Sequence, residues 1–309
     1  MFPGPGNCLA DCLPVMAEWT IRLLETPAEM AAVEALQRLV WPGSETDVIP
    51  AHMLLAIVHN GGLALGASVG DHLVGVSFGF PGFYTTPAGP RLKHHSHILG
   101  VHPEWRGKGV GFALKRAQWQ MVRRQGLDRI TWTYDPLLSH NAHLNISSLG
   151  AICNTYLRSE YGEMRDSMNT GLPSDRFQVD WWLNTGRVER RLSRRSRPVL
   201  TLDHYRTAEA SLLEAHTDRG PALCPPEETS SLTGTLLLIE IPSDFQALKS
   251  TDLHLGRAWR LYTRKVFEQA FATGYLVTDF LHDQGRSFYI LTHGESTFQD
   301  GGTRTDIQD

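Results

Sequence analysis

Two kinds of spacing between apolar residues alternate along the first 186 residues of this chain. Apolar side chains recur every third or fourth position over residues 28–40 and 110–124, which predicts two amphipathic helices. A third helix is expected over 139–150, where Leu-Gly marks its end. Between these helices, alternating or continuous apolar runs predict strands at residues 62–68, 72–80, 98–101, 128–135, 151–157 and 176–183. The interleaved strands and helices predict an α/β fold.

The second half of the chain carries a fainter version of the same order. An apolar run over 236–241 precedes Pro242, an amphipathic helix is expected over about 258–272, and a strand over 275–281. No glycine-rich loop follows the first of these strands. Two interpretations stay open, namely a degenerate copy that packs on the first half or completes its sheet, and an unrelated α/β extension.

The chain is long enough for two domains, because 309 residues with 41% hydrophobic and 20% charged residues are typical of globular protein. Residues 1–15 are rich in Pro and Gly and are expected to form a disordered extension, with Met16 as an alternative start. The first domain is expected over 16–186 and an arginine-rich linker over 187–198. A smaller α/β region would then cover 199–309, with a disordered tail from about 298.

Charge and cysteine content bear on the partners and location to be expected. A net charge of −4 and a pI near 6.4 give no electrostatic reason to expect nucleic acid or an anionic membrane, and no apolar run is long enough to span a bilayer. Four cysteines are too few for a disulfide framework, so a reducing, cytoplasmic location is expected. Cys8 and Cys12 lack the second pair of ligands that a zinc site needs, and no metal is expected.

The most informative segment is the glycine-rich run that follows the strand ending at Val101. A proline at position 103 stops the strand, and the next helix begins within a few residues. Glycines at 107, 109 and 111 remove side chains where backbone N–H groups of a helix entrance would face an anion. Arg106 and Lys108 add positive charge beside this turn. The segment therefore predicts a phosphate-binding loop.

Two common phosphate loops do not fit these residues, because no Ser or Thr follows Lys108 and the spacing Gly107-x-Gly109-x-Gly111 differs from Gly-x-Gly-x-x-Gly. The pattern Arg-x-x-Gly-x-Gly, preceded by Leu-Gly-Val-x-Pro, resembles the coenzyme A signature of the GNAT acyltransferases. The resemblance covers about Trp19 to Leu183. It implies a mixed central sheet whose strands splay apart, with acetyl-CoA or another acyl-CoA as co-substrate. The coenzyme-binding residues that it implies are Leu99, Gly100, Val101, Arg106, Gly107, Lys108, Gly109, Val110, Gly111, Asn141 and Asn145.

Three histidines supply candidates for the base that acyl transfer to an amine requires. Alternation along the strand places His95 and His97 on the face of Leu99 and Val101, with His94 on the other face unless a bulge shifts the register. We expect His97, or else His95, to act as the base or to order a water that does, because histidine titrates near neutral pH. A surface or structural histidine is the alternative.

The acid that protonates the leaving thiolate is harder to assign. Many GNAT enzymes place a tyrosine on the helix after the second strand, and alignment on Leu149-Gly150 puts Ile146 at that position. Ile146 cannot donate a proton. Tyr134 and Tyr156 are the substitutes that the sequence offers, although buried structural tyrosines are more common.

These residues together predict a coenzyme A-dependent N-acyltransferase that moves acetyl, or succinyl, to the amine of a small molecule by direct attack. An amino acid is one candidate acceptor, with Arg158, Arg165 or Arg176 as candidate carboxylate partners. A non-catalytic acyl-CoA sensor is the alternative, and nucleic-acid binding through residues 187–197 a weaker one. A homodimer is among the assemblies left open.

Overall fold

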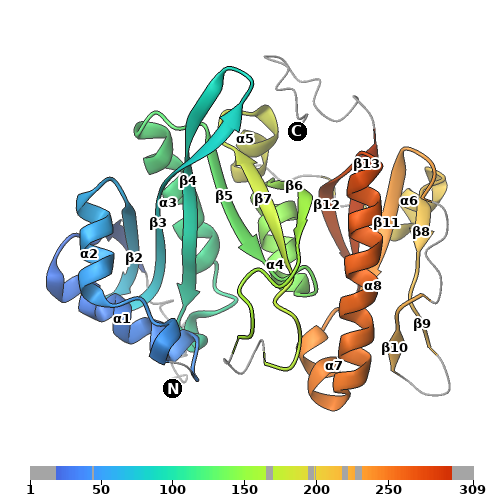
Figure 1. The fold of residues 1–309 in the computed structure, drawn as a ribbon, viewed down its shortest axis with the longest axis horizontal. Coiled ribbons are helices and arrows are strands. Elements are labelled where there is room, and N and C mark those ends of the chain that lie inside the picture. Colours follow the sequence, from blue (N-terminus) through green and yellow to red (C-terminus); the bar gives the residue numbers. More distant parts are fainter. Residues whose placement is uncertain are drawn as a thin grey trace, which may run out of the picture.

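The computed structural model describes residues 19–43, 45–164, 170–193, 198, 200–217, 222–226 and 232–293. A mixed sheet of eleven strands runs through both halves of the chain, in the order β1-β2-β3-β4-β5-β7-β6-β12-β13-β11-β8 (Figure 1). The elements of the first half are β1 Thr20–Leu23, α1 Pro27–Val40, η1 Glu45–Asp47, α2 Ala51–His59, β2 Leu63–Val69, β3 His72–Thr86, β4 Gly89–Val101, η2 Pro103–Trp105, α3 Val110–Arg124, β5 Arg129–Tyr134, α4 Ser139–Ala142, η3 His143–Ser148, β6 Ile152–Leu157, β7 Arg176–Trp182 and α5 Gly186–Leu192.

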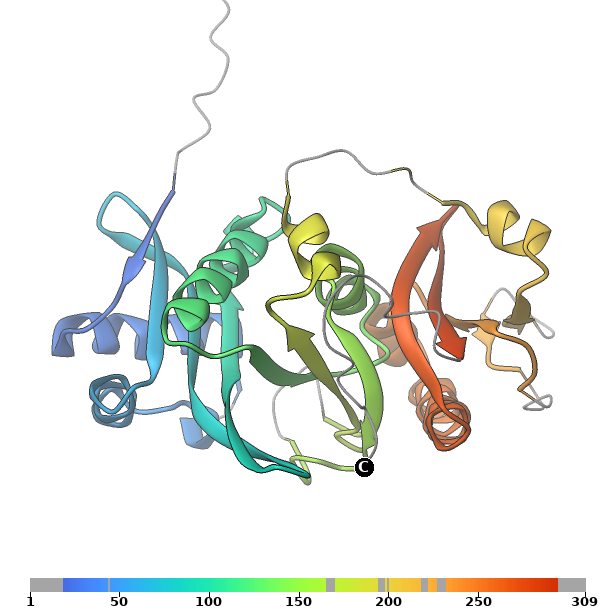
Figure 2. The same cartoon turned by 90° about the horizontal axis from the view of Figure 1, so that it is seen from above.

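The second half adds strands and helices at the far end of this sheet. Its elements are α6 Leu202–Thr207, β8 Ser211–Leu213, β9 His216–Thr217, β10 Leu223–Cys224, β11 Leu236–Ile241, α7 Phe245–Thr251, α8 Leu253–Ala272, β12 Tyr275–Asp283 and β13 Arg286–His293. Strands β9 and β10 form a separate two-stranded sheet. Seen from above, α1, α2 and α8 lie on one face of the large sheet, and α3, α4 and α5 lie on the other (Figure 2).

Most helices and strands expected from the apolar spacing are present, with ends that differ by a few residues. The helix α1 begins at a capping box, in which the Thr26 side chain accepts from the Glu29 N–H and the Glu29 carboxylate accepts from the Thr26 N–H. The third expected helix changes character along its length, because α4 gives way to a π-helical segment, η3. A π-helix contains wider turns than an α-helix, so positions counted back from Leu149-Gly150 are displaced around the axis.

The splayed sheet implied by the glycine-rich motif is confirmed. β4 and β5 are parallel neighbours, yet they pair only at His94 with Ile130 and at His95 with Thr131. Beyond these pairs both strands continue, β4 to Val101 and β5 to Tyr134, without bonding to each other. The strands therefore diverge toward the end where the glycine-rich loop begins, as Figure 1 shows.

The second half completes the sheet of the first half, which was one of the two arrangements that the sequence left open. The strand–helix–strand order expected over 236–281 is present as β11, α8 and β12. However, β13 lies between β11 and β12, whereas β4 and β5 are direct neighbours. The order of elements is thus repeated without the arrangement of strands, because β11 and β12 are not neighbours and cannot diverge from each other as β4 and β5 do.

The expected basic linker is wrong for its first residues, which form the helix α5. Thr185 caps this helix, and its apolar residues Val188 and Leu192 are buried in the core. Arg187 donates to the carbonyls of Gly150 and Thr278, so a residue expected to be solvated joins the two halves. Residues 194–197 lie outside the described part of the chain, and the boundary at 198 stays a prediction.

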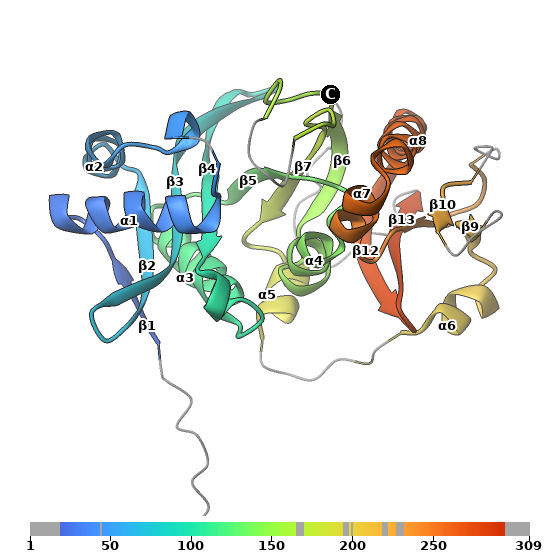
Figure 3. The same cartoon turned by 90° about the horizontal axis from the view of Figure 1, so that it is seen from below.

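One face of α8 binds the first half through charged side chains spaced four residues apart. Arg260 forms a buried two-pronged salt bridge with Asp135, at 2.9 and 2.5 Å. Arg264 bonds both carboxylate oxygens of Asp175 at 2.8 Å, and Glu268 pairs with Arg158. Burial alone would raise the pKa of Asp135, but the Arg260 and Arg176 guanidinium groups and the Leu137 N–H together hold that pKa below its ordinary value. Figure 3 shows α8 alongside the strands of the first half.

Several sequence-based expectations fall on residues outside the described part, namely the extension at 1–15, Cys8, Cys12, Arg165 and the tail from about 298. Within the described residues, no helix is both long enough and apolar enough to cross a lipid bilayer.

Candidate functional site

The glycine-rich segment forms an uncapped entrance to helix α3. Gly107 and Gly109 have left-handed φ values of 72° and 81°, and a Cβ at either position would meet no described atom within 4 Å. No side chain caps α3, and its first backbone bond runs from the Ala113 N–H to the Gly109 carbonyl at 3.0 Å. The N–H groups of Val110, Gly111 and Phe112 precede that bond and therefore have no acceptor within the helix. This end of a fifteen-residue helix offers N–H donors and positive dipole charge to an anion.

The two basic residues of the loop occupy different positions. The Arg106 guanidinium donates to the carbonyl of Val101 and to that of Val40, both at 3.3 Å, so it ties the end of α1 to the end of β4. Lys108 is exposed, with its ammonium 4.6 Å from the centre of the Trp105 ring. Arg106 thus fixes the shape of the loop, and Lys108 is the side chain free to approach a phosphate.

The other residues expected to bind coenzyme A also lie near this entrance. A Cβ at Gly111 would lie 3.8 Å from Val101, 3.9 Å from Leu99 and 4.0 Å from Leu144, which places the end of β4, the start of α3 and the η3 segment together. Asn141 is half-buried on α4, and Asn145 is buried in η3. Their contact with a coenzyme stays a prediction.

A β-bulge at His97 reverses the expected faces of β4. Ser96 pairs with Gly79 and Ile98 pairs with Phe78, so His97 is an extra residue on β4. Before the bulge, His94 and Ser96 point toward α3, and after it Leu99 and Val101 do. The expectation that His95 and His97 share a face with Leu99 and Val101 is therefore wrong.

His95 and His97 instead lie on the face of the sheet that carries α1 and α2. The centres of their rings are 5.7 Å apart. The centre of the Phe80 ring lies 5.2 Å from that of His95 and 5.8 Å from that of His97, and Phe80 packs against the core that contains the buried residues of α1. Burial, reinforced by the charges of His97, Lys93 and Lys115, lowers the pKa of His95 to about 4. Burial alone lowers the pKa of His97, which is the more exposed of the two. Both imidazoles are neutral at pH 7.

On the opposite face, a buried polar cluster fills the point where β4 and β5 diverge. The Lys115 ammonium donates to the Ser96 hydroxyl at 2.7 Å and to Gln118 Oε1 at 3.2 Å, and it lies 3.8 Å from the centre of the Trp132 ring. Complete burial lowers the pKa of Lys115 well below its ordinary value. Gln118 Nε2 also bonds His94 Nε2 at 3.2 Å. These side chains lie beside the point where the strands separate, and local sequence patterns did not predict the cluster.

The tyrosines proposed as acids are engaged elsewhere. Tyr134 is buried, and its hydroxyl lies 3.1 Å from that of Tyr289, which donates to the Pro136 carbonyl. Tyr156 donates to Asp175 at 2.8 Å, and burial raises its pKa. Ile146 is fully buried in the core. The structure therefore gives no support for Tyr134 or Tyr156 as the acid that protonates the leaving thiolate.

The arginines proposed as carboxylate partners are engaged as well. Arg158 forms its salt bridge with Glu268, and Arg176 is buried 3.9 Å from Asp135.

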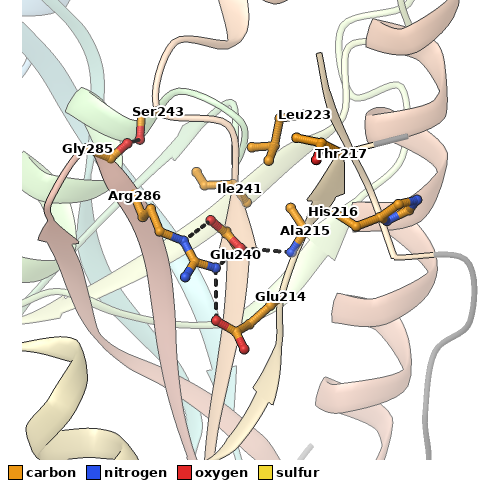
Figure 4. Close-up of a pocket in the computed structure, with 10 residues that line it drawn as sticks. All are labelled: Glu214, Ala215, His216, Thr217, Leu223, Glu240, Ile241, Ser243, Gly285 and Arg286. Atoms are coloured by element: carbon orange, nitrogen blue, oxygen red, sulfur yellow. Dashed lines mark hydrogen bonds and ion pairs between the residues drawn. The ribbon is translucent and has the colours of Figure 1, made fainter. Parts of the chain in front are cut away.

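A cavity of about 640 Å³ lies in the second half, away from the glycine-rich loop (Figure 4). Its buried Glu240 accepts from both Nε and Nη2 of Arg286 and from the Ala215 N–H, so the carboxylate is fully paired. Glu214 bonds Arg286 at 2.9 Å and Arg206 at 3.0 Å. The charges of these four side chains balance, and no unpaired group among them favours a particular ligand.

Diverging parallel strands beside an uncapped, glycine-rich helix entrance define this structure as an α/β acyltransferase fold of the GNAT type. Residues 30–144 match the model of the acetyltransferase (GNAT) family. No curated protein matches the chain. Among the described residues, no group of three or more His, Cys, Asp or Glu side chains is placed to hold a metal ion.

Solved structures similar to this chain include several acetyltransferases at low identity. The ribosomal-protein-S18-alanine N-acetyltransferase from Escherichia coli is 13% identical, with 55% of this chain and 96% of that chain covered and a TM-score of 0.41. An aminoglycoside 6′-acetyltransferase type Ii is 19% identical, with 58% and 99% covered and a TM-score of 0.42. The yncA protein from Salmonella typhimurium, solved with acetyl-CoA, is 18% identical, with 54% and 94% covered and a TM-score of 0.42.

Proposed function

We propose that this protein is an N-acetyltransferase that transfers acetyl from acetyl-CoA to the amine of a small molecule. The observation that carries the proposal is the uncapped entrance of α3, which lies at the end of β4 where β4 and β5 separate. An entrance of this kind suits the pyrophosphate of coenzyme A, and the pantetheine arm would run between the two strands along Leu99 and Val101. The GNAT family match over residues 30–144 supports the same assignment.

The chemistry would be direct attack of a neutral amine on the thioester carbonyl. A C–N bond forms, the C–S bond breaks, coenzyme A leaves as a thiolate, and the amine loses a proton. His97 is the better candidate for accepting that proton, directly or through water, because it is neutral and the more accessible of the pair. A base works best when its pKa lies near the working pH, so His95, with a pKa of about 4, is the weaker candidate.

The first test is thermal unfolding with coenzyme A, acetyl-CoA and succinyl-CoA, together with measurement of thiol release in the presence of amines. A ligand at a hundred times its Kd stabilises the folded state by about 2.7 kcal/mol. Gly109→Asp places a carboxylate at the entrance of α3 and should abolish this stabilisation. Gly126→Asp is the matched control, because Gly126 follows the other end of α3, has a φ of 79° and has open space around its Cα.

The outcomes separate the candidate functions. Stabilisation that Gly109→Asp abolishes, together with thiol release, supports the transferase. Stabilisation without thiol release supports an acyl-CoA sensor instead, and no stabilisation by any of the three ligands contradicts the coenzyme site itself.

A further inference from the structure

The strands beside His95 present a polar face that no described helix covers. In Figures 2 and 3, α1 and α2 lie toward one end of this side of the sheet and α8 toward the other, and the strands β4, β5 and β7 lie between them. The register places side chains of these strands in rows. His95 pairs with Thr131, and Thr131 with Asp180. Two residues further from the glycine-rich loop, Arg129 of β5 pairs with Trp182 of β7, and Lys93 of β4 lies close enough for the Arg129 charge to act on it.

Arg129 is already fully engaged in this row. Its guanidinium bonds Asp180 at 2.6 and 2.7 Å, with both side chains about 15% exposed. The same guanidinium lies 4.4 Å from the centre of the Tyr84 ring and 4.8 Å from that of Trp182. Arg129 and Asp180 therefore form a neutral, rigid pair in the floor of this face.

Lys93 is the unbalanced charge beside that pair. It is half-buried, and it makes no hydrogen bond or salt bridge with a described residue. Burial and the charge of Arg129 lower the pKa of Lys93, and Asp180 acts in the opposite direction. A half-buried ammonium without a paired carboxylate is stabilised by an anion that binds against it.

Lys93 also stands in line with the candidate base. Residues two apart on a strand share a face and lie roughly 7 Å apart, so Lys93, His95 and the bulged His97 follow one another along β4 toward the diverging strands. A molecule lying along this row would bring one end to His97 and the other to Lys93.

We infer that the acceptor is an amine that carries an anionic group several bonds from its nitrogen, and that Lys93 binds this group. The anion is a carboxylate or a phosphate, since both accept charge-assisted hydrogen bonds from an ammonium. The inference rests on the proposed acetyl transfer, because that reaction places the reacting amine near His97. It replaces Arg158, Arg165 and Arg176 with Lys93 as the expected partner of the acceptor's anionic group.

The kinetic test compares ω-amino acids of three to six carbons with unsubstituted alkylamines of the same lengths, and adds O-phosphoethanolamine as the phosphate arm. Wild type should show a kcat/KM for the best anionic acceptor about 10- to 100-fold above that for its neutral match, the range of one charge-assisted hydrogen bond. Lys93→Met should remove this preference by raising KM for anionic acceptors only, and Lys93→Arg should restore part of it. Lys265→Met, on the exposed face of α8, is the control.

A binding measurement separates this inference from the proposed reaction. Titration of 5-aminovalerate and O-phosphoethanolamine into the protein saturated with coenzyme A should give an affinity that Lys93→Met lowers by about tenfold or more. Binding that depends on Lys93 without thiol release would uphold the anion site and contradict acetyl transfer to these amines. Equal kcat/KM values for anionic and neutral amines in the wild type would overturn the inference. An equal fall in kcat/KM for both kinds of amine in Lys93→Met would overturn it as well. Neither result would contradict the proposed acetyl transfer.

Discussion

The buried salt bridge between Asp135 and Arg260 should be a main energetic connection between the two halves of the chain. Both residues are almost completely buried, and two hydrogen bonds join them. Removal of Arg260 leaves the buried Asp135 carboxylate with the more distant Arg176 guanidinium, 3.9 Å away, and breaking a buried pair in this way costs about 3–5 kcal/mol. Arg260→Met should therefore lower the free energy of unfolding by about that amount. An unfolding entropy of roughly 2.1 cal/mol/K per residue converts it to a fall in Tm of about 5–8 °C.

A double-mutant cycle measured by urea unfolding tests this reasoning. Asp135→Asn alone should be similarly destabilising, whereas Asp135→Asn with Arg260→Met should cost clearly less than the two single changes added together, because neither charge of the pair is then left buried without the other. Glu268→Gln serves as the control on the same helix, since its partner Arg158 is 62% exposed and surface pairs contribute little. Single changes that cost under about 1 kcal/mol, or that simply add, would refute the argument.

Three further predictions concern the base, the buried histidine and the second half. His97→Ala should abolish thiol release while coenzyme A still raises Tm; unchanged turnover in both His97→Ala and His95→Ala would eliminate them as bases. Burial lowers the pKa of His94 to about 3, so stability should fall as pH drops below 6.5, by about 2 kcal/mol at pH 5. His94→Gln should flatten that fall in urea titrations at pH 7.5 and 5, and an equal slope in both proteins would contradict it. A chain ending at residue 200 should be insoluble, because it removes the buried side chains of α8 from the core and Arg260 from Asp135; a stable monomer in sedimentation would count against this.

Local sequence patterns located most of the first half of the fold, although β1 and α2 were not among the expected elements. The apolar spacing located α1, α3 and the strands around them, because each pattern reflects contacts that the segment makes with one core. The glycine spacing from Gly107 to Gly111 located the helix entrance, because left-handed φ values at Gly107 and Gly109 leave a local signature.

The errors have a common physical cause, since they depend on contacts between distant segments. The bulge at His97 is set by the pairing of β4 with β3, and alternation within β4 alone assigned the wrong face. The arginines of α5 were expected to be solvated. In the structure, Arg187 and Arg191 donate hydrogen bonds to other elements, including Thr278 and Asp279 of β12. The position of β13 between β11 and β12 likewise follows from tertiary pairing, so a repeated order of elements did not reveal it.

The pairing of β12 with β6 also determines which strands remain open to other molecules. An unpaired strand at a sheet edge offers backbone N–H and C=O groups to any extended chain, and natural proteins keep such edges short or covered. Here the edges of the large sheet are β1, with four residues, and β8, with three. The six-residue β6, which would form an edge in the first half alone, pairs with β12 at Cys153 with Val277 and also lies against α8. We therefore expect the second half to protect the first half against strand-to-strand aggregation, a role that requires no chemistry of its own.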